Sequence, residues 1–186
     1  RFKKEELPEQ EMACQFLTGD EIVLEIGGNI GRNSLVIASI LKDATNLLTL
    51  ESSESIAKEL ITNREKSGLN FHIENSALSK RKLIQGTQKK NKWDTVPSDT
   101  LIKGYEWIKT ITLEEIKEKY KLNFNTLVLD CEGAFYYILK DMPEILENIK
   151  LIIMENDYKT IKEYTYIRDI LTANDFKLNY SRIHPN

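Results

Sequence analysis

The sequence predicts a single-domain α/β fold, with a mostly parallel central sheet and helices on both faces. Short apolar runs alternate with longer segments of helical periodicity, which is the pattern of repeated β–α–β units. Some of the runs, such as residues 151–154, lack polar alternation, as expected of strands that are buried on both faces. The 186 residues are enough for one hydrophobic core, so we expect one domain over residues 1–186.

The first half of the chain begins with a helical or irregular lead-in over residues 1–20. Strands are then expected at residues 22–26, 47–50 and 71–74. Helices are expected at residues 33–42 and 54–66, between these strands. Gly68 follows the second helix in the position of a C-terminal cap.

The second half begins with a break in this rhythm. Residues 79–110 are polar, weakly periodic and contain several turn residues, which indicates an inserted flap or hairpin. Thr112 then begins a short helix, with Glu115 placed three residues later to complete a capping box. Further strands are expected at residues 126–129, 151–154 and 176–180, and helices at residues 134–140 and 158–173.

The composition is that of an ordinary soluble globular protein, with 41% hydrophobic and 30% charged residues. No stretch approaches the roughly 20 apolar residues of a membrane helix, and the N-terminus has no apolar signal core. We therefore expect a soluble cytoplasmic protein without a membrane partner. Cys14 and Cys131 form no metal-binding motif, and we expect both to be reduced thiols.

Basic residues are concentrated between Lys80 and Lys92, a stretch that contains six of them and no acid. The favoured interpretation is a solvated loop. The alternative is a basic flap that meets a phosphate-bearing acceptor. The net charge of −3 argues against a protein that coats nucleic acid, so a nucleic-acid partner is the less favoured expectation.

A glycine-rich turn follows the first predicted strand, in the segment Glu25-Ile26-Gly27-Gly28-Asn29-Ile30-Gly31. A strand, then glycines, then the start of a helix is the layout of a nucleotide-cofactor site. The segment lacks the G-x-G-x-x-G spacing of dinucleotide-binding folds, and an acid precedes the glycines. This favours a ligand with a cationic amino-acid end beside an adenosine, such as S-adenosylmethionine.

Polar residues also follow the other predicted strands. Ligands of open α/β sheets bind beyond the carboxyl ends of the strands, so these residues are expected to face one cleft. Glu51 ends the second strand, where a carboxylate can accept hydrogen bonds from both ribose hydroxyls. The remaining strand-end residues are Asn75 and Ser76, Asp130 to Glu132, and Glu155 to Asp157.

These motifs, in this order and spacing, resemble the FkbM-type methyltransferases, a family of class I S-adenosylmethionine-dependent enzymes with a Rossmann-like fold. The resemblance rests on EIGGNIGRNSL, LLTLESSES, NSALS at residues 75–79, LVLDCEGAF at residues 127–135 and LIIMEN at residues 151–156. It implies that the cofactor is bound by Glu25, Gly27, Gly28, Asn29, Gly31, Glu51, Ser52, Asn75, Ser76, Ala77 and Asp130.

The resemblance also implies a reaction centre at Asp130, Glu132 and Glu155. Two interpretations stay open for these acids: one carboxylate acts as a general base, or Asp130, Glu155 and Asn156 hold Mg²⁺. Val128 and Phe135 occupy positions where the family usually has a lysine and an acid, which implies a less polar acceptor pocket.

The expected function is therefore S-adenosylmethionine-dependent O-methylation of a hydroxyl on a sugar, nucleotide sugar or small metabolite. Two alternatives differ in kind. The first is a methyltransferase that acts on RNA, as the basic stretch suggests. The second is a cofactor-binding module without catalysis, as the changes at Val128 and Phe135 suggest.

Overall fold

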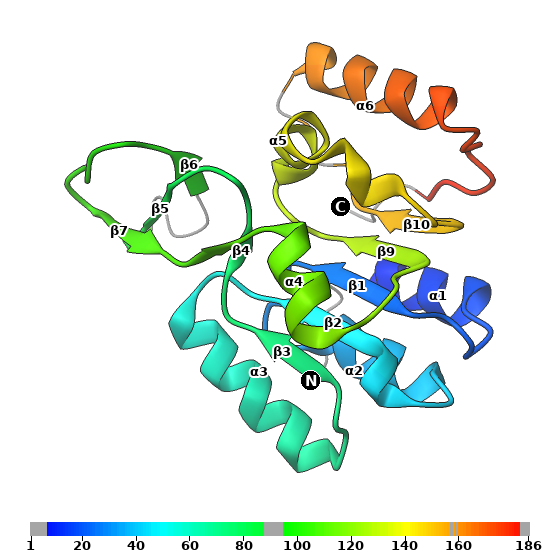
Figure 1. Cartoon of the computed structure of the whole chain (residues 1–186). Helices are drawn as coiled ribbons and strands as arrows, with labels where there is room; N and C mark the ends of the chain where they lie inside the picture. Colours follow the sequence, from blue (N-terminus) through cyan, green and yellow to red (C-terminus); the bar gives the residue numbers. More distant parts are fainter. Residues whose placement is uncertain (1–6, 88–94, 157, 159, 183–186) are drawn as a thin grey trace.

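The computed structural model describes residues 7–87, 95–156, 158 and 160–182 (Figure 1). Its centre is a five-stranded parallel sheet with the strand order β10-β9-β1-β2-β3. The strands are β1 (Val23–Ile26), β2 (Leu47–Leu50), β3 (His72–Glu74), β9 (Thr126–Leu129) and β10 (Leu151–Met154). The predicted α/β fold with a mostly parallel sheet is confirmed.

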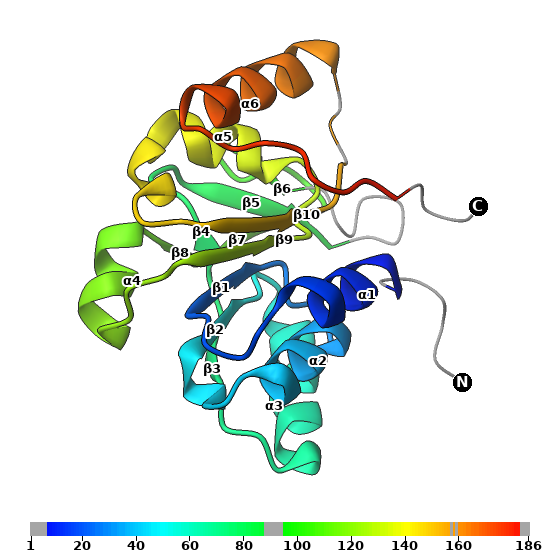
Figure 2. The ribbon, with the colours of Figure 1, turned by 90° about the vertical axis from the view of Figure 1, so that its right-hand side faces the viewer.

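Three helices cover one face of the sheet, and three cover the other (Figure 2). The first set is α1 (Leu7–Phe16), α2 (Arg32–Ile40) and α3 (Glu54–Ser67). The second set is α4 (Leu113–Tyr120), α5 (Ala134–Asp141) and α6 (Ile161–Ala173). Among the described residues there are also two short 3₁₀ helices, η1 (Ala44–Asn46) and η2 (Pro143–Leu146).

Alternate residues of each strand belong to opposite cores because side chains alternate across a strand. In β1, Val23 packs in the core beneath α1–α3, whereas Leu24 and Ile26 pack in the core beneath α4–α6. Fully burying one such side chain stabilises the fold by about 1.5 to 3 kcal/mol. This alternation decides which strand residues reach each helical layer.

The helix boundaries follow from local capping. Gly68 closes α3 with a left-handed φ of 70°, as predicted, and Thr112 and Glu115 form the predicted capping box of α4. The last helix begins at Ile161 instead of at residue 158. Thr160 caps it and accepts a hydrogen bond from the N–H of Glu163, which sets the first turn.

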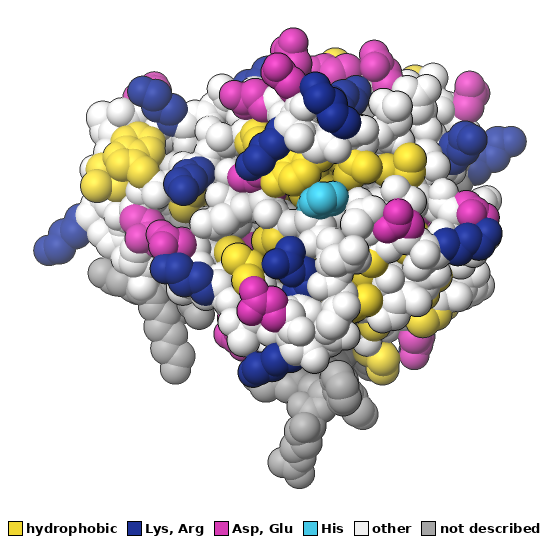
Figure 3. Space-filling model, turned by 60° about the horizontal axis from the view of Figure 1, so that its bottom comes forward, with side chains coloured by type: hydrophobic (Ala, Val, Ile, Leu, Met, Phe, Trp, Pro, Cys, Tyr) yellow, Lys and Arg dark blue, Asp and Glu magenta, His cyan; other side chains and the backbone are white. Residues whose placement is uncertain are grey.

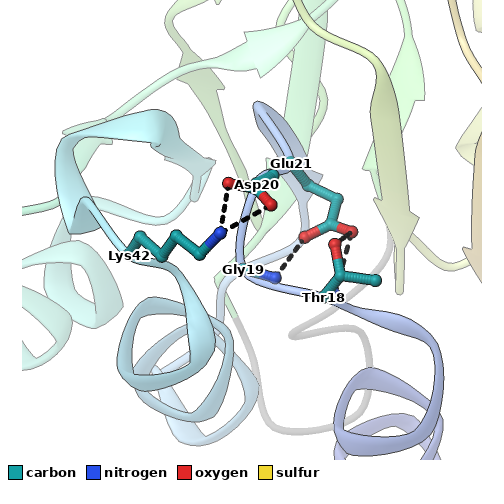
Figure 4. Close-up of polar contacts among 5 residues, drawn as sticks. All are labelled: Thr18, Gly19, Asp20, Glu21 and Lys42. Carbon is teal, nitrogen blue, oxygen red and sulfur yellow. Dashed lines mark hydrogen bonds and ion pairs between the residues drawn. The ribbon is translucent and has the colours of Figure 1, made fainter.

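The short connection between α1 and β1 is fixed by polar contacts of Glu21 and Asp20, which lie just before β1 (Figure 4). The Glu21 carboxylate accepts hydrogen bonds from the N–H groups of Thr18 (2.9 Å) and Gly19 (2.8 Å). Lys42, just after α2, pairs with Asp20 at 2.7 Å. That ion pair is exposed and contributes little stability, but the backbone contacts to Glu21 fix how the chain enters β1.

Residues 77–111 add two small sheets. The strands β4 (Ala77–Leu78) and β8 (Thr110–Ile111) form a parallel pair. The strands β5 (Leu83–Gly86), β6 (Thr95–Pro97) and β7 (Tyr105–Ile108) form an antiparallel sheet, hereafter the small sheet, in the order β6-β5-β7. It lies to the left of the main sheet in Figure 1. This is the segment for which a flap or hairpin was expected.

The strand predicted at residues 176–180 is wrong, because that segment pairs with no strand. Figure 2 shows the chain leaving α6 and running past β10 towards α1. There the ring of Tyr180 meets that of Phe16 edge to face at 5.6 Å, and Arg182 pairs with Glu11. Leu178 is 86% exposed, so the apolar alternation that suggested a strand does not reflect burial.

The surface carries charges of both signs. On the face drawn in Figure 3, basic and acidic side chains are interspersed. Within the described part of the chain, every helix is too short or too polar to span a bilayer.

Candidate functional site

A pocket of about 580 Å³ lies at the carboxyl ends of the main-sheet strands, between them and the small sheet. Its strand-end lining consists of Gly27, Asn29, Glu51, Ser52, Ser76, Ala77, Asp130, Cys131, Glu132, Gly133 and Glu155. The small sheet contributes Leu83, Gln85, Thr95, Val96 and Pro97. Residues that are far apart in the sequence therefore meet at the edge where an open α/β sheet binds its ligand.

Glu51 connects the glycine turn to the start of α3. Its carboxylate accepts hydrogen bonds from the N–H of Asn29 at 2.9 Å and from the N–H of Ser53 at 2.8 Å. The residue is 7% exposed, and burial raises the pKa of Glu51 even though both N–H groups act to lower it. A carboxylate has about four acceptor positions, so Glu51 keeps acceptor capacity for a donor in the pocket.

The three glycines of the turn have different roles. Gly27 has a φ of +95°, and a Cβ there would lie 1.7 Å from the carbonyl oxygen of Asp130. A Cβ at Gly28 would lie 2.2 Å from Thr49, and one at Gly31 would lie 2.5 Å from Leu60. We expected all three to let a cofactor approach the backbone. Only Gly27 lines the pocket, whereas Gly28 and Gly31 let the turn pack against β2 and α3.

Glu25 faces away from the pocket, towards α2. It is 1% exposed and accepts hydrogen bonds from Ser34 Oγ (2.5 Å), Thr49 Oγ1 (2.7 Å) and Asn33 Nδ2 (3.2 Å). The strand alternation explains this orientation, because Ile26 points to the opposite core and reaches the pocket. The direct cofactor contact expected of Glu25 does not fit this burial. Instead, the carboxylate ties the first turn of α2 to β1 and β2.

The segment after β3 divides in a similar way. Ser76 and Ala77 line the pocket, but Asn75 does not. Its Nδ2 donates to the backbone carbonyls of Glu51 at 2.8 Å and of Ser52 at 3.2 Å. Asn75 therefore holds the end of β2 in place, which differs from the cofactor contact expected of it.

Ser76 is positioned by Glu74. Glu74 accepts hydrogen bonds from Lys119 Nζ (2.5 Å), Tyr120 Oη (2.7 Å) and Ser76 Oγ (2.9 Å). Burial acts to raise the pKa of Glu74, but these three donors together lower it. The same burial, with the hydrogen bond to Glu74, raises the pKa of Tyr120 to about 12. This cluster links α4 to the pocket wall.

The turn after β9 brings Asp130, Cys131 and Glu132 to the pocket. Glu132 has a φ of 52°, and Gly133 after it has a φ of 80° as the N-cap of α5. A left-handed conformation is costly for a glutamate, and such strain occurs often at functional turns. Glu155 lines the same pocket, whereas Asn156 does not. Asp157 lies outside the described residues.

The described residues do not support a metal site. Among them, no group of three or more histidine, cysteine, aspartate or glutamate side chains is arranged to hold a metal ion. The Mg²⁺ site expected at Asp130, Glu155 and Asn156 therefore has no support in the described geometry.

The expected effect of Val128 and Phe135 on the pocket does not fit their positions. Val128 is 1% exposed in the core beneath α1–α3, and Phe135 is 2% exposed in the core beneath α4–α6. Neither residue lines the pocket, so neither makes it less polar.

Sequence reasoning missed part of the pocket wall. Arg81 pairs with Asp141 through Nε and Oδ2 (2.5 Å) and through Nη2 and Oδ1 (2.7 Å). Its guanidinium lies 5.4 Å from the ring centre of Tyr137, which is 40% exposed and lines the pocket. Gln85 was also missed. No local signal marks these residues, because the partners are distant in sequence or come from the small sheet.

The pocket has an excess of acidic residues. The acidic residues in its described lining are Glu9, Glu51, Asp130, Glu132, Asp141, Glu155 and Glu163, and the basic ones are Arg32 and Arg81. Asp141 and Arg81 neutralise each other. The remaining charge favours neutral or cationic ligands over anionic ones.

Comparison with solved structures places this fold among the methyltransferases. The O-methyltransferase from Bacillus cereus in complex with SAH is similar at a TM-score of 0.53 and 14% identity, over 90% of this chain and 69% of that chain. An rRNA methylase from Streptococcus thermophilus is similar at a TM-score of 0.51 and 9% identity, over 92% and 81%. A third similar structure is the O-methyltransferase TomG from Streptomyces achromogenes, involved in tomaymycin synthesis, in complex with SAM. Its TM-score is 0.51 and its identity 12%, over 89% of this chain and 68% of that chain.

At these identities the similarity is one of fold, and the chain has the Rossmann-like fold of these class I methyltransferases. No protein-family model matches the sequence, and no curated protein does so significantly. The finer resemblance to the FkbM-type family therefore rests on the motifs alone.

Proposed function

We propose that this protein is an S-adenosylmethionine-dependent methyltransferase. The observation that carries the proposal is the buried Glu51 carboxylate, which lies at the end of β2 with acceptor positions left for a ribose. It lies in a pocket at the strand ends of a methyltransferase fold. In open α/β sheets, a carboxylate at the end of the second strand is the usual partner of ribose hydroxyls.

The order of the strands supports our assignment of the other cofactor contacts. Neighbouring strands lie about 4.8 Å apart, so residues at the ends of β9, β1, β2 and β3 form a row along one edge. Asp130 and Gly27 would hold the amino-acid end of the cofactor, and Glu51 its ribose. Ser76 and Ala77, beyond Glu51 in this row, would lie near the adenine.

The bound cofactor supplies a methyl group on a positively charged sulfur, which is already reactive towards an oxygen. The residues of the chain must align the acceptor, exclude water and accept its proton. Asp130 is the residue we assign as general base, with Glu132 and Glu155 in the same pocket.

We propose a hydroxyl of a sugar, nucleotide sugar or small metabolite as the acceptor. Among these acceptors, the excess of acids in the pocket favours a sugar or small metabolite without phosphate over a nucleotide sugar. The exposed ring of Tyr137 in the pocket wall offers a flat surface for a sugar or an aromatic ring.

An RNA acceptor is the second candidate. The fold is also similar to that of an rRNA methylase, and Lys80, Arg81 and Lys82 are basic residues at the start of the small sheet. However, Lys80 and Arg81 are paired with Glu144 and Asp141. The rest of the basic stretch, including Lys89, Lys90 and Lys92, lies outside the described residues.

A methyl-transfer screen with labelled cofactor tests the proposal. Sugars, nucleotide sugars, phenols and RNA are offered as acceptors, with and without EDTA. We expect transfer to a small hydroxyl compound, unaffected by EDTA and only weakly dependent on salt. Transfer to RNA that falls steeply with salt would instead support the second candidate.

The variant Asp130→Asn supplies the control for catalysis. Because Asp130 is also assigned to the amino-acid end of the cofactor, we expect the variant to bind S-adenosylhomocysteine more weakly and to transfer little methyl even at saturating cofactor. Cofactor binding without transfer to any acceptor class, by the parent protein, would contradict the enzyme and support a binding module.

A further inference from the structure

Gln85, on β5, is a buried polar residue of the pocket wall. It is 5% exposed, and its Nε2 donates to Ser52 Oγ at 3.0 Å and to Thr95 Oγ1 at 3.1 Å. Both N–H groups of the carboxamide are thus used. Within the described part of the chain, no hydrogen bond reaches its Oε1.

The position of Gln85 relates it to one end of the pocket. Its partner Ser52 directly follows Glu51, the residue assigned to the ribose. Because the amino-acid end of the cofactor is assigned to the β9 and β1 side, the base attached to the ribose extends the other way, towards Ser76 and Ala77. The hydrogen bond to Ser52 holds the carboxamide of Gln85 next to this end.

We propose that Gln85 recognises the adenine base of the cofactor, with its Oε1 accepting a hydrogen bond from the exocyclic amino group. This inference rests on the proposed function. Asn75 does not take this role, because it does not line the pocket, whereas Gln85 does. The small sheet therefore supplies a base contact that the end of β3 does not.

The chemistry of the contact makes it selective. The carboxamide oxygen of a residue that lines the pocket can accept a hydrogen bond from a ligand, and the amino group of adenine is a donor of the right kind. Hypoxanthine has a carbonyl oxygen at the same position, which would bring two acceptors together. A site that pairs a buried polar group with its ligand rejects an analogue that cannot pair with it.

Calorimetric titration with two compounds tests the proposal. S-adenosylhomocysteine and S-inosylhomocysteine differ at the amino group of the base. We expect the parent protein to bind the adenosine compound about tenfold more tightly, as the loss of one hydrogen bond and the meeting of two acceptors imply. In Gln85→Met, which keeps the length of the side chain without its oxygen, that preference should disappear.

Two further variants separate recognition from support of the small sheet. Thr95→Val removes one partner of Nε2 but leaves Oε1, so the preference should persist. Gln85→Glu keeps acceptor oxygens, towards which the hydroxyls of Ser52 and Thr95 can donate, and it should also keep the preference. If Gln85→Met does not fold, as judged by circular dichroism, loss of the preference in Gln85→Glu would overturn the proposal.

The remaining outcomes are distinct. Equal binding of both compounds by the parent protein would overturn the role of Gln85 and leave the proposed function standing. If Gln85→Met binds both compounds more weakly by the same factor, Gln85 only supports the pocket wall. That result would also overturn the proposed contact between Gln85 and the base. Binding of neither compound by the parent would overturn the proposed function together with this inference.

Discussion

A methyl group on Gly27 would lie 1.7 Å from the backbone carbonyl oxygen of Asp130. The glycine turn after β1 and the acidic turn after β9 are therefore in contact through backbone atoms, at the point where both enter the pocket. No side chain fits between them, and the φ of Gly27 is itself unfavourable for any residue with a Cβ.

The variant Gly27→Ala should lose more than about 3 kcal/mol of stability, because backbone strain and a clash with backbone occur together. Urea unfolding measures the loss. Gly68→Ala is the matched control, since Gly68 also has a positive φ but no atom within 4 Å of the added methyl. We expect about 1 to 2 kcal/mol for the control, and equal losses in the two variants would contradict the contact with Asp130.

Removal of the Glu51 carboxylate should weaken the binding of S-adenosylhomocysteine. We expect Glu51→Ala to lose at least about tenfold in affinity, because hydrogen bonds to a charged group are worth about 1.5 to 3 kcal/mol. Calorimetry provides the measurement. Glu54→Ala, which removes an exposed acid paired with Lys58, should bind as the parent does. Unchanged affinity in Glu51→Ala would refute the ribose assignment.

The same binding should depend on pH. Burial raises the pKa of Glu51, and in the proposed complex the ribose hydroxyls would donate to the charged carboxylate. The affinity should therefore fall as the pH is lowered through this raised pKa, at a pH above the ordinary range of a glutamate. Glu51→Gln, which cannot titrate, should bind more weakly but with a flat pH profile. A parent profile that is equally flat would contradict the role of Glu51.

The stability of the ligand-free protein should respond to Glu51 in the opposite direction. A carboxyl whose pKa is raised by folding contributes stability below its unfolded pKa, and that contribution is lost as the pH rises through the folded pKa. The charged form that suits the ligand is thus the form that the fold tolerates less well.

Glu74 has the reverse pH dependence, because its pKa is lowered by its donors. Its contribution to stability is present above the unfolded pKa and is lost as the pH falls through the folded pKa. We expect Glu74→Gln to lose about 1 to 2 kcal/mol at neutral pH, mainly from the bonds to Tyr120 and Ser76, since Lys119 is 57% exposed.

Urea unfolding at neutral and acidic pH provides the test of Glu74. The difference between Glu74→Gln and the parent should shrink at acidic pH. Glu118→Gln, an exposed residue of the same helix as Lys119, serves as the control and should match the parent at both values. A difference independent of pH would show that the charge on Glu74 is not what stabilises the cluster.

Most of the main sheet could be predicted from the sequence. The strands at residues 47–50, 126–129 and 151–154 have the predicted bounds, because each is a short apolar run between polar residues. The end of α3 at Gly68 and the start of α4 at Thr112 were also predictable, because capping depends on residues that are close together in the sequence. The strand predicted at residues 176–180 does not form. A strand needs a neighbouring strand to pair with, and the local pattern of apolar residues does not show whether one is present.

The candidate site was predictable to a lesser degree. The strand-end positions of Glu51, Asp130 and Glu155 were evident, because the ends of parallel strands share one edge. The direction of Glu25 was not, since it depends on which helical layer each face of β1 meets. Gln85 and Arg81 could not be found, because their contacts depend on how the small sheet packs against residues 33 and 60 positions away.

The sheet order also has a consequence for when the pocket can form during synthesis. β1 is synthesised before both of the strands with which it pairs. One of them, β9, begins about one hundred residues later in the chain. Until β9 leaves the ribosome, the glycine turn lacks the backbone surface of Asp130 against which Gly27 packs. A nascent chain that contains only the first three strands would therefore present Glu51 without a complete pocket, and ligand capture must wait for the closure of this long loop.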